Sequence, residues 1–256
     1  MAKQVKYLVL LIIHVFIYSF SLYAQIDNKS FLKYQLSIPR VSKAWAKYND
    51  STKKEFAKSK IDFPPYEIYL RAFKAQNELE LWARNNDTAE YTLIKTLRVC
   101  AICGVLGPKR ARGDNQIPEG FYYIEEFNPK SEFYLSLRIN YPNYIDKKVS
   151  LSKELGGDIY MHGGCVTIGC IPMTDEGIQE LYVICLNAKS NGQNNIPVHI
   201  FPTRFTKNGM NYLKREYGKD KEKIQFWNDL KGSYDYFEKY HKLLPLCYTI
   251  DGRYLN

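Results

Sequence analysis

Runs of alternating polar and apolar residues, joined by short polar connections, constrain the fold of this chain most. Glu67–Phe73 and Glu78–Arg84 both alternate with period two, and Gln76-Asn77 between them suits a tight connection. Alternation of this kind places successive side chains on opposite faces of a β-strand. A third run, Tyr91–Val99, follows after a polar break. Short strands at such close spacing predict an antiparallel meander.

Further strands and one amphipathic helix continue the pattern. The remaining predicted strands are Gly120–Glu126, Glu132–Ile139, Ile159–Met161 and Pro197–Phe201. Apolar residues at helical spacing in Thr174–Asn187 predict a helix, with Thr174 or Asp175 as its N-cap. Residues 25–63 and 203–256 are rich in charged and aromatic residues, in a pattern that predicts helices. We predict a mainly β (α+β) domain over residues 64–202, an antiparallel β sandwich or barrel, with helical N- and C-terminal extensions.

Residues 1–24 have the layout of a secretory signal peptide. Lys3 and Lys6 precede the almost wholly apolar Tyr7–Phe20, and Ala24 provides a small residue at a cleavage position. The apolar run is short of the roughly 20 residues that a membrane-spanning helix needs. We therefore expect an exported protein of the periplasm or cell envelope, cleaved after Ala24. An uncleaved N-terminal anchor is the alternative.

The charge of the chain restricts its partners. The formal net charge is +9, and basic residues are scattered along the chain. A basic surface favours an anionic partner such as nucleic acid, anionic lipid or an anionic polymer. For an exported protein, cell-wall polymer is the more reasonable partner and nucleic acid is not expected. Scattered lysines are, however, also typical of an ordinary solvated surface.

The six cysteines allow disulfides in an oxidising compartment, but a chain of this size does not need them. Cys185 has apolar neighbours and is typical of a core cysteine. Cys100 and Cys103 form a C-x-x-C pair, but no second pair or histidine set completes a zinc site. We expect no metal and no cofactor.

The segment Met161–Asp175 contains one histidine, two cysteines and three glycines. Gly169, directly before Cys170, permits a sharp turn that exposes the sulfur and directs N–H groups toward an oxyanion. A following helix and a nearby imidazolium would favour the thiolate. A cysteine nucleophile also needs a base, and His162 has a suitable ordinary pKa.

Two alternatives remain for this segment. Cys165 is a rival nucleophile that lacks the preceding glycine turn, and a glycine-rich junction with merely packed His and Cys side chains is the plainer interpretation. His162 is favoured by elimination among four histidines. His14 lies in the signal peptide, His199 in an apolar strand and His241 in the C-terminal extension.

Two separated motifs resemble the L,D-transpeptidase catalytic domain family (YkuD type), in its YafK-like branch. His162-Gly163 followed by Thr167-x-Gly169-Cys170 is similar to the catalytic signature of that family. The stretch from Gly107-Pro108-Lys109-Arg110 to Pro118-Glu119-Gly120 is similar to a second family segment, and the predicted hairpin at 68–82 matches its opening strands. The resemblance covers about residues 64–202.

The resemblance implies a metal-free enzyme acting on peptidoglycan stem peptides. Cys170 would attack the carbonyl on the L-centre of a meso-diaminopimelate residue, with His162 as acid and base. The resemblance further implies that Gly163 supplies the carbonyl that orients His162, that Gly169 and Cys170 give oxyanion N–H groups, and that Thr167 takes the family's Ser/Thr position. An amine acceptor would give a crosslink or a protein anchor, and water would give hydrolysis.

This chain departs from the family pattern at two positions. Ile168 and Pro172 stand where many members carry a cationic or polar side chain. Lys109, Arg110 or Arg112 are candidates for binding the substrate carboxylate instead; a basic surface loop is the alternative. The expected protein is a monomeric L,D-transpeptidase whose partners are stem peptides, with a wall-anchored protein as a further candidate partner. A hydrolase or amidase using the same thioester, a wall-binding module without activity and a general thiol protease are the alternatives.

Overall fold

A computed structural model of the chain describes residues 28–255. The signal peptide predicted for residues 1–24 lies outside the described residues. Helical residues 28–36 come first. The principal helices are α2 (Pro39–Lys58), α3 (Tyr144–Val149), α4 (Asp175–Ser190), α5 (Lys207–Tyr217) and α6 (Lys221–Tyr240). The strands are β1 (Glu67–Phe73), β2 (Glu78–Arg84), β3 (Thr92–Arg98), β4 (Gly120–Asn128), β5 (Ser136–Ile139), β6 (Tyr160–His162), β7 (Ile171–Pro172) and β8 (Ile196–Phe201), with β9 (Cys247–Tyr248) and β10 (Tyr254–Leu255) apart from them.

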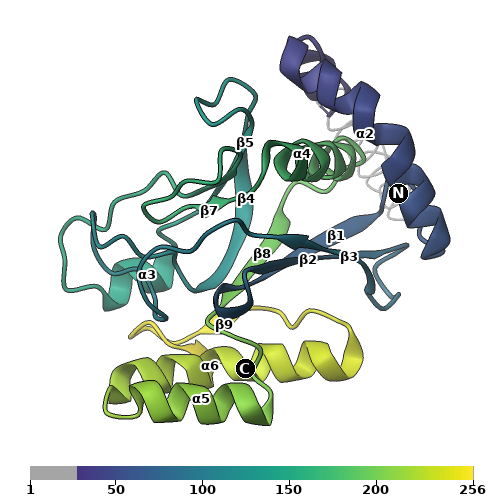
Figure 1. Ribbon diagram of the computed structural model, residues 1–256. Helices are drawn as coiled ribbons and strands as arrows, with labels where there is room; N and C mark the ends of the chain where they lie inside the picture. Colours follow the sequence, from purple (N-terminus) through teal and green to yellow (C-terminus); the bar gives the residue numbers. More distant parts are fainter. Residues whose placement is uncertain (1–27, 256) are drawn as a thin grey trace, which may run out of the picture.

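The first eight strands form a single sheet in the order β3-β2-β1-β8-β4-β5-β6-β7 (Figure 1). The predicted meander is confirmed, because β1 pairs antiparallel with β2 and β2 with β3. A short 3-10 turn, Lys74–Gln76, and Asn77 in the left-handed conformation connect β1 to β2. Most other pairs are antiparallel as well, but β1 pairs parallel with β8 and β6 parallel with β7. The mainly β, α+β fold class is therefore confirmed, as one sheet.

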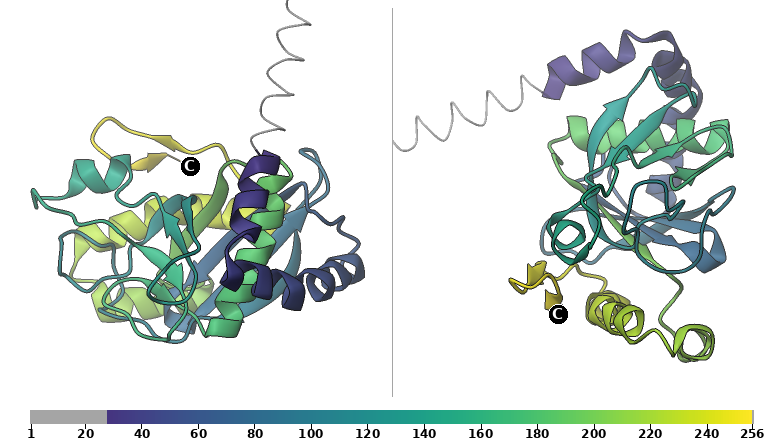
Figure 2. Two further views of the ribbon diagram at one scale, coloured as in Figure 1. Left: turned by 90° about the horizontal axis from the view of Figure 1, so that it is seen from above. Right: turned by 90° about the vertical axis from the view of Figure 1, so that its left-hand side faces the viewer.

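Helices cover both faces of this sheet (Figures 1 and 2). One face packs on α4, which is itself covered by α2, and its apolar core includes Ile68 and Leu70 of β1. The other face packs on α5 and α6, and its core includes Phe73 of β1 together with Trp227. Alternate residues of β1 therefore serve two cores, which explains why nearly the whole strand is buried.

The structure adds detail that the sequence pattern did not reveal. The predicted strand over residues 132–139 begins only at Ser136, because residues 129–135 form the turn between β4 and β5. The short helix α3 was not predicted; Asn143 caps it and Asp146 completes a capping box. The C-terminal extension contains the β9–β10 hairpin in addition to its two helices. Within residues 28–255, no helix is both long and apolar enough to cross a membrane.

Trp227 joins the C-terminal extension to the sheet and gives a test of this packing. Its side chain is fully buried, and its indole N–H donates to Glu119 Oε2 at 2.6 Å. Glu119 is also paired with the buried Lys74 at 2.9 Å. Trp227→Ala removes the apolar contacts and leaves Glu119 short of a donor. We expect it to lower the free energy of unfolding by about 3–5 kcal/mol in urea denaturation.

The matched control for Trp227→Ala is Tyr212→Ala on α5, whose side chain is exposed. Surface substitutions usually change stability by no more than about 0.5 kcal/mol. Equal destabilisation by the two variants would contradict the role given to Trp227.

Candidate active site

The parallel pairing of β6 with β7 places His162 and Cys170 on one face of the sheet edge. Met161 pairs with Ile171 and His162 with Pro172, so the residue before Ile171, Cys170, stands at the level of Tyr160. Side chains two residues apart along a strand point the same way. Met161 and Ile171 are buried and face the core. His162 and Cys170 consequently project together from the opposite face.

One hydrogen bond determines which ring nitrogen of His162 carries the proton when the imidazole is neutral. Its Nδ1 lies 2.6 Å from Gly163 O, so Nδ1 carries the proton that it donates to this carbonyl. Nε2 is then the basic nitrogen of the ring. Burial lowers the pKa of His162 below its ordinary value of 6.5, and the bond to Gly163 O opposes this only in part. The imidazole is therefore neutral near pH 7 and able to accept a proton.

Gly163 has no room for a side chain. A Cβ built at this residue would lie 2.5 Å from Asp175 Oδ1 and 2.9 Å from Phe133 O. The N–H of Gly163 donates to that same Phe133 carbonyl at 3.0 Å. Glycine is thus required where the peptide that orients His162 passes between two neighbouring segments.

The Cys170 thiol is half-buried and carries a proton at neutral pH. Burial raises its pKa above the ordinary value of 9.0, and the charge of Asp158 raises it further. The N–H of Tyr160, 3.5 Å from Sγ, and the charge of Lys109 act in the opposite direction. The helix α4 begins beside Gly164, whose N–H donates to Asp175 Oδ1. The resting state is thus a neutral thiol and a neutral imidazole, rather than the thiolate favoured in the sequence analysis.

The turn before Cys170 has the predicted positive φ but uses its N–H groups differently. Gly169 has a φ of 141°, and a Cβ there would lie 2.9 Å from Gln116 O. Thr167 Oγ1 accepts hydrogen bonds from the N–H groups of both Gly169 and Cys170, at 3.0 and 2.7 Å, and donates to Cys170 O. In this structure those two N–H groups are therefore engaged by Thr167, and the N–H of Tyr160 is the one directed at the sulfur.

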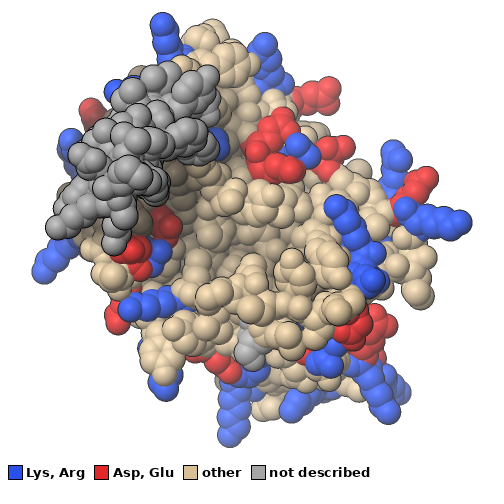
Figure 3. Space-filling view, turned by 180° about the vertical axis from the view of Figure 1, so that it is seen from behind, with Lys and Arg blue, Asp and Glu red and all other residues tan. Residues whose placement is uncertain are grey.

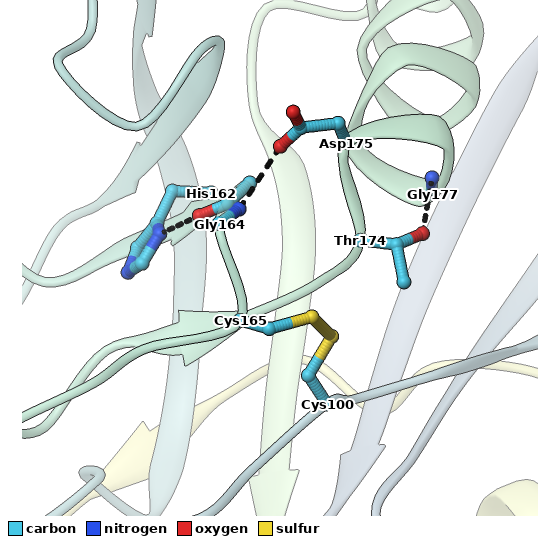
Figure 4. Close-up of a disulfide and its surroundings, with 8 residues drawn as sticks. Cys100, His162, Gly164, Cys165, Thr174, Asp175 and Gly177 are labelled. Carbon is cyan, nitrogen blue, oxygen red and sulfur yellow. Dashed lines mark hydrogen bonds between the residues drawn. A yellow bond between two sulfur atoms is a disulfide. The ribbon is translucent and has the colours of Figure 1, made fainter.

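A disulfide joins Cys100 to Cys165, which is one of the two candidate nucleophiles (Figure 4). Cys165 has no free thiol, whereas Cys170 does. The bond links the segment after β3 to the loop that follows His162 across 65 residues of sequence. The sequence leaves the pairing of the cysteines open, and the structure pairs these two although a chain of this size does not need disulfides. Cys185 is a buried free cysteine, as expected.

The three basic candidates lie in different environments. Lys109 is almost completely buried, and its ammonium donates to Asp114 Oδ1 and Ala111 O. Arg110 lies over the ring of Phe226, with Nη1 3.7 Å from Asp146 Oδ1, and Arg112 is exposed. Of the three, Lys109 is the one whose charge acts on the Cys170 thiol.

The surface does not concentrate basic side chains on the face seen in Figure 3. Lysine and arginine side chains there lie around the edge, and acidic side chains stand among them. The centre of this face is largely without charged groups. On the part of this face that Figure 3 shows, basic and acidic side chains are therefore mixed rather than separated.

The other histidines among the described residues do not join this site. His199 is buried on the face covered by α6, 2.9 Å from the hydroxyl of Tyr69, and burial lowers its pKa to about 3. His241 ends α6 in the left-handed conformation. Within residues 28–255 there is also no group of three or more His, Cys, Asp or Glu side chains that could hold a metal ion.

A pocket of about 590 Å³ opens beside the turn at residues 130–134 and involves residues that sequence reasoning missed. Phe133 and Gly164 line it together with Asp175 and Arg40 of α2. The ring of Phe133 lies against the ring of His162, with centroids 4.7 Å apart. No pattern in the sequence marks Phe133 or Arg40. Phe133 lies in a turn that was assigned to a strand, and Arg40 lies on a helix about 120 residues before His162.

The disulfide predicts a specific labelling pattern. Without reductant, iodoacetamide should modify Cys170 and leave Cys100 and Cys165 unmodified in peptide mapping by mass spectrometry. After reduction in denaturant all three should be labelled. Alkylation of Cys165 in the unreduced folded protein would show that the bond is absent and would reopen its candidacy as nucleophile.

The two pKa shifts predict how the alkylation rate of Cys170 depends on pH. The thiolate is the reactive form. Because the pKa of Cys170 is raised above 9.0 while that of His162 is lowered below 6.5, the free protein holds little thiolate at pH 7. The rate should rise about tenfold per pH unit from pH 6 to 9. A plateau across that range would indicate a preformed thiolate–imidazolium pair, and loss of the signal in Cys170→Ala identifies the site.

Comparisons with known proteins agree on a family. The model of the L,D-transpeptidase catalytic domain (YkuD) matches residues 67–200. The "Putative L,D-transpeptidase YafK" of Escherichia coli, in strains K12 and O157:H7, is 35% identical over 190 residues, which are 73% of this chain and 73% of the relative.

Solved structures with a similar fold have lower sequence identity. The helical cell shape determining protein Pgp2 of Campylobacter jejuni is 16% identical, and the match covers 77% of this chain and 80% of Pgp2 with a TM-score of 0.42. The K307A mutant of Pgp2 is 19% identical, and that match covers 66% of this chain and 60% of the mutant with a TM-score of 0.43. Bd1075 of Bdellovibrio bacteriovorus is 22% identical, and the match covers 68% of this chain and 63% of Bd1075 with a TM-score of 0.39. The assignment therefore rests on the family model and the Escherichia coli relative: the chain belongs to the L,D-transpeptidase catalytic domain family.

Proposed function

We propose that this protein is a cysteine-dependent peptidoglycan L,D-transpeptidase that forms an acyl-enzyme on Cys170. The observation that carries the proposal is the bond from His162 Nδ1–H to Gly163 O, which leaves Nε2 as the base on the face from which Cys170 projects. Family membership supports the reaction class. The disulfide of Cys165 supports Cys170 as the nucleophile.

In the acylation step, His162 Nε2 takes the proton of the Cys170 thiol as Sγ attacks the carbonyl on the L-centre of diaminopimelate. The carbonyl π electrons move to oxygen and give a tetrahedral oxyanion. Its collapse breaks the C–N bond to the following residue, and the imidazolium returns the proton to the leaving amine. A neutral thiol and a neutral imidazole are the correct starting protonation states for this sequence.

The second step releases the acyl group. An acceptor amine attacks the thioester, His162 accepts its proton, and cleavage of the C–S bond regenerates the thiol. A diaminopimelate amine on a neighbouring stem would give a crosslink, and an amine of a protein would give an anchored protein. Water as the acceptor gives hydrolysis, and exclusion of water around Cys170 determines the ratio.

Lys109 is the basic residue that we propose for electrostatic attraction of the substrate carboxylate. Its charge already acts on the sulfur of Cys170. Asp114 and Ala111 O fix its position, so it is pre-organised but partly neutralised. Arg110 is directed at Asp146 and Phe226 instead, and Arg112 extends into solvent.

We further propose that the protein acts outside the cytoplasm, in the periplasm or cell envelope. The Cys100–Cys165 disulfide is consistent with an oxidising compartment, where such bonds form and persist. The apolar segment at residues 7–20 suits export.

The decisive experiment combines intact-protein mass spectrometry with product analysis. The protein from residue 25 onward is incubated with a purified tetrapeptide stem, with and without an acceptor stem. We expect a covalent adduct on Cys170, crosslinked product with the acceptor, and free tripeptide acid where water competes. Cys170→Ala should give no adduct and no product, and His162→Gln should lower kcat by about 100-fold or more.

The matched control is the double variant Cys100→Ser/Cys165→Ser, which removes the disulfide and keeps both catalytic side chains. It should retain the adduct on Cys170. Turnover by Cys170→Ala, or an adduct on another residue, would refute the proposed function. A wild-type adduct that yields only the hydrolysis product would make the protein a hydrolase of the same chemistry.

A further inference from the structure

Arg40, at the start of α2, binds the turn between β4 and β5 although it lies about 90 residues away in sequence. Its Nη1 donates to Ser131 O at 2.7 Å and to Tyr134 O at 2.5 Å. The guanidinium also lies over the ring of Tyr134, 5.9 Å from its centroid. A planar, permanently charged donor of this kind fixes the two carbonyls relative to each other. Arg40 thus holds both ends of residues 131–134.

The same turn carries the residue that contacts the catalytic histidine. Within it, the N–H of Phe133 donates to Ser131 Oγ, which sets the direction of the Phe133 peptide. Phe133 O then accepts the N–H of Gly163, and the Phe133 ring packs on the His162 ring with an interplanar angle of 36°. Gly163 O is the acceptor for His162 Nδ1.

These contacts form a continuous chain from the N-terminal helix to the imidazole. We propose that Arg40 is a positioning residue for His162: through residues 131–134 it places the Phe133 ring and carbonyl, and these hold Gly163 and the imidazole in the orientation that directs Nε2 toward the reacting thiol. The helix α2 is then part of the active-site assembly and not only a cover for α4. The inference rests on the proposed role of His162 as acid and base.

A role of Arg40 in stability alone, or in binding substrate, would appear differently in kinetics. Arg40 also lines the pocket beside Phe133, so a substrate group could in principle contact it. Loss of a binding contact raises KM, whereas misorientation of a catalytic base lowers kcat and leaves KM nearly unchanged. The role proposed for Arg40 does not use an ion pair, since both of these hydrogen bonds go to backbone carbonyls.

The test compares Arg40→Ala, Arg40→Lys and the control Lys43→Ala in the stem-peptide assay. Lys43 is an exposed residue of the same helix, one turn from Arg40. We expect Arg40→Ala to lower kcat by about 10- to 100-fold, the scale of a displaced catalytic group, with KM within about twofold. Arg40→Lys should recover part of kcat because an ammonium can reach one of the two carbonyls. Lys43→Ala should match the wild type.

A spectroscopic readout separates positioning from folding. The Nδ1–H of His162, bonded to Gly163 O, should give a downfield proton NMR signal that His162→Gln removes. Arg40→Ala should broaden or abolish this signal while the thermal transition shows that the protein is folded. If Arg40→Ala does not fold, Arg40→Lys supplies the comparison, since its ammonium keeps the charge but reaches only one of the two carbonyls.

Several results would overturn the inference. An unchanged kcat in Arg40→Ala, a change in KM alone, or a lowered kcat with an unaltered His162 signal would each exclude positioning by Arg40. These outcomes presuppose a wild-type protein that turns over the stem peptide. A wild type without turnover or adduct would instead refute the proposed function, so the two failures are distinguishable.

Discussion

The short parallel pairing of β6 with β7 is the constraint on which the site depends. It fixes Tyr160–His162 against Ile171–Pro172, so that Met161 and Ile171 anchor the edge of the sheet in the core while His162 and Cys170 share the opposite face. A slip of one residue would exchange the two faces and turn His162 and Cys170 toward the core. The loop between the strands is therefore held at several points: by the disulfide of Cys165, by the Thr167 hydroxyl in the turn, and by Asp175 at the start of α4.

Electrostatics at this edge keep both reacting groups neutral. Desolvation disfavours the charged form of an acid and of a base alike, which raises the pKa of Cys170 and lowers that of His162. The hydrogen bond to Gly163 O selects the tautomer without adding a charge to the site, unlike a carboxylate partner. In the proposed mechanism, charge is separated between Sγ and Nε2 only when substrate is attacked, so the protein contributes mainly by orienting the ring.

The sequence predicted most of what depends on local pattern. Period-two alternation located β1, β2 and β3 nearly to the residue, and Thr174 caps α4 as expected. Elimination and resemblance pointed to His162 and Cys170, whose catalytic roles stay a prediction, and the predicted fold class is confirmed. What depends on contacts between distant segments was not predicted: the Cys100–Cys165 bond joins positions 65 residues apart, and Arg40 reaches a turn about 90 residues away. Most of the turn at residues 131–134 was assigned to a strand, because Phe133 and Tyr134 are residue types favoured in strands and directly precede β5.

The neutral state of Cys170 also explains how a free thiol can coexist with a disulfide five residues away. Thiol–disulfide exchange requires attack by a thiolate, and oxidation to sulfenic acid likewise begins from it. Burial that raises the pKa of Cys170 lowers the thiolate fraction at neutral pH, so both side reactions are slowed in an oxidising compartment. In the proposed mechanism, the proton leaves the sulfur only when an oriented imidazole and an electrophilic carbonyl are present together. On that mechanism, the burial that makes the thiol a poor resting nucleophile also preserves it for acylation, and the orientation of His162 determines when it becomes reactive.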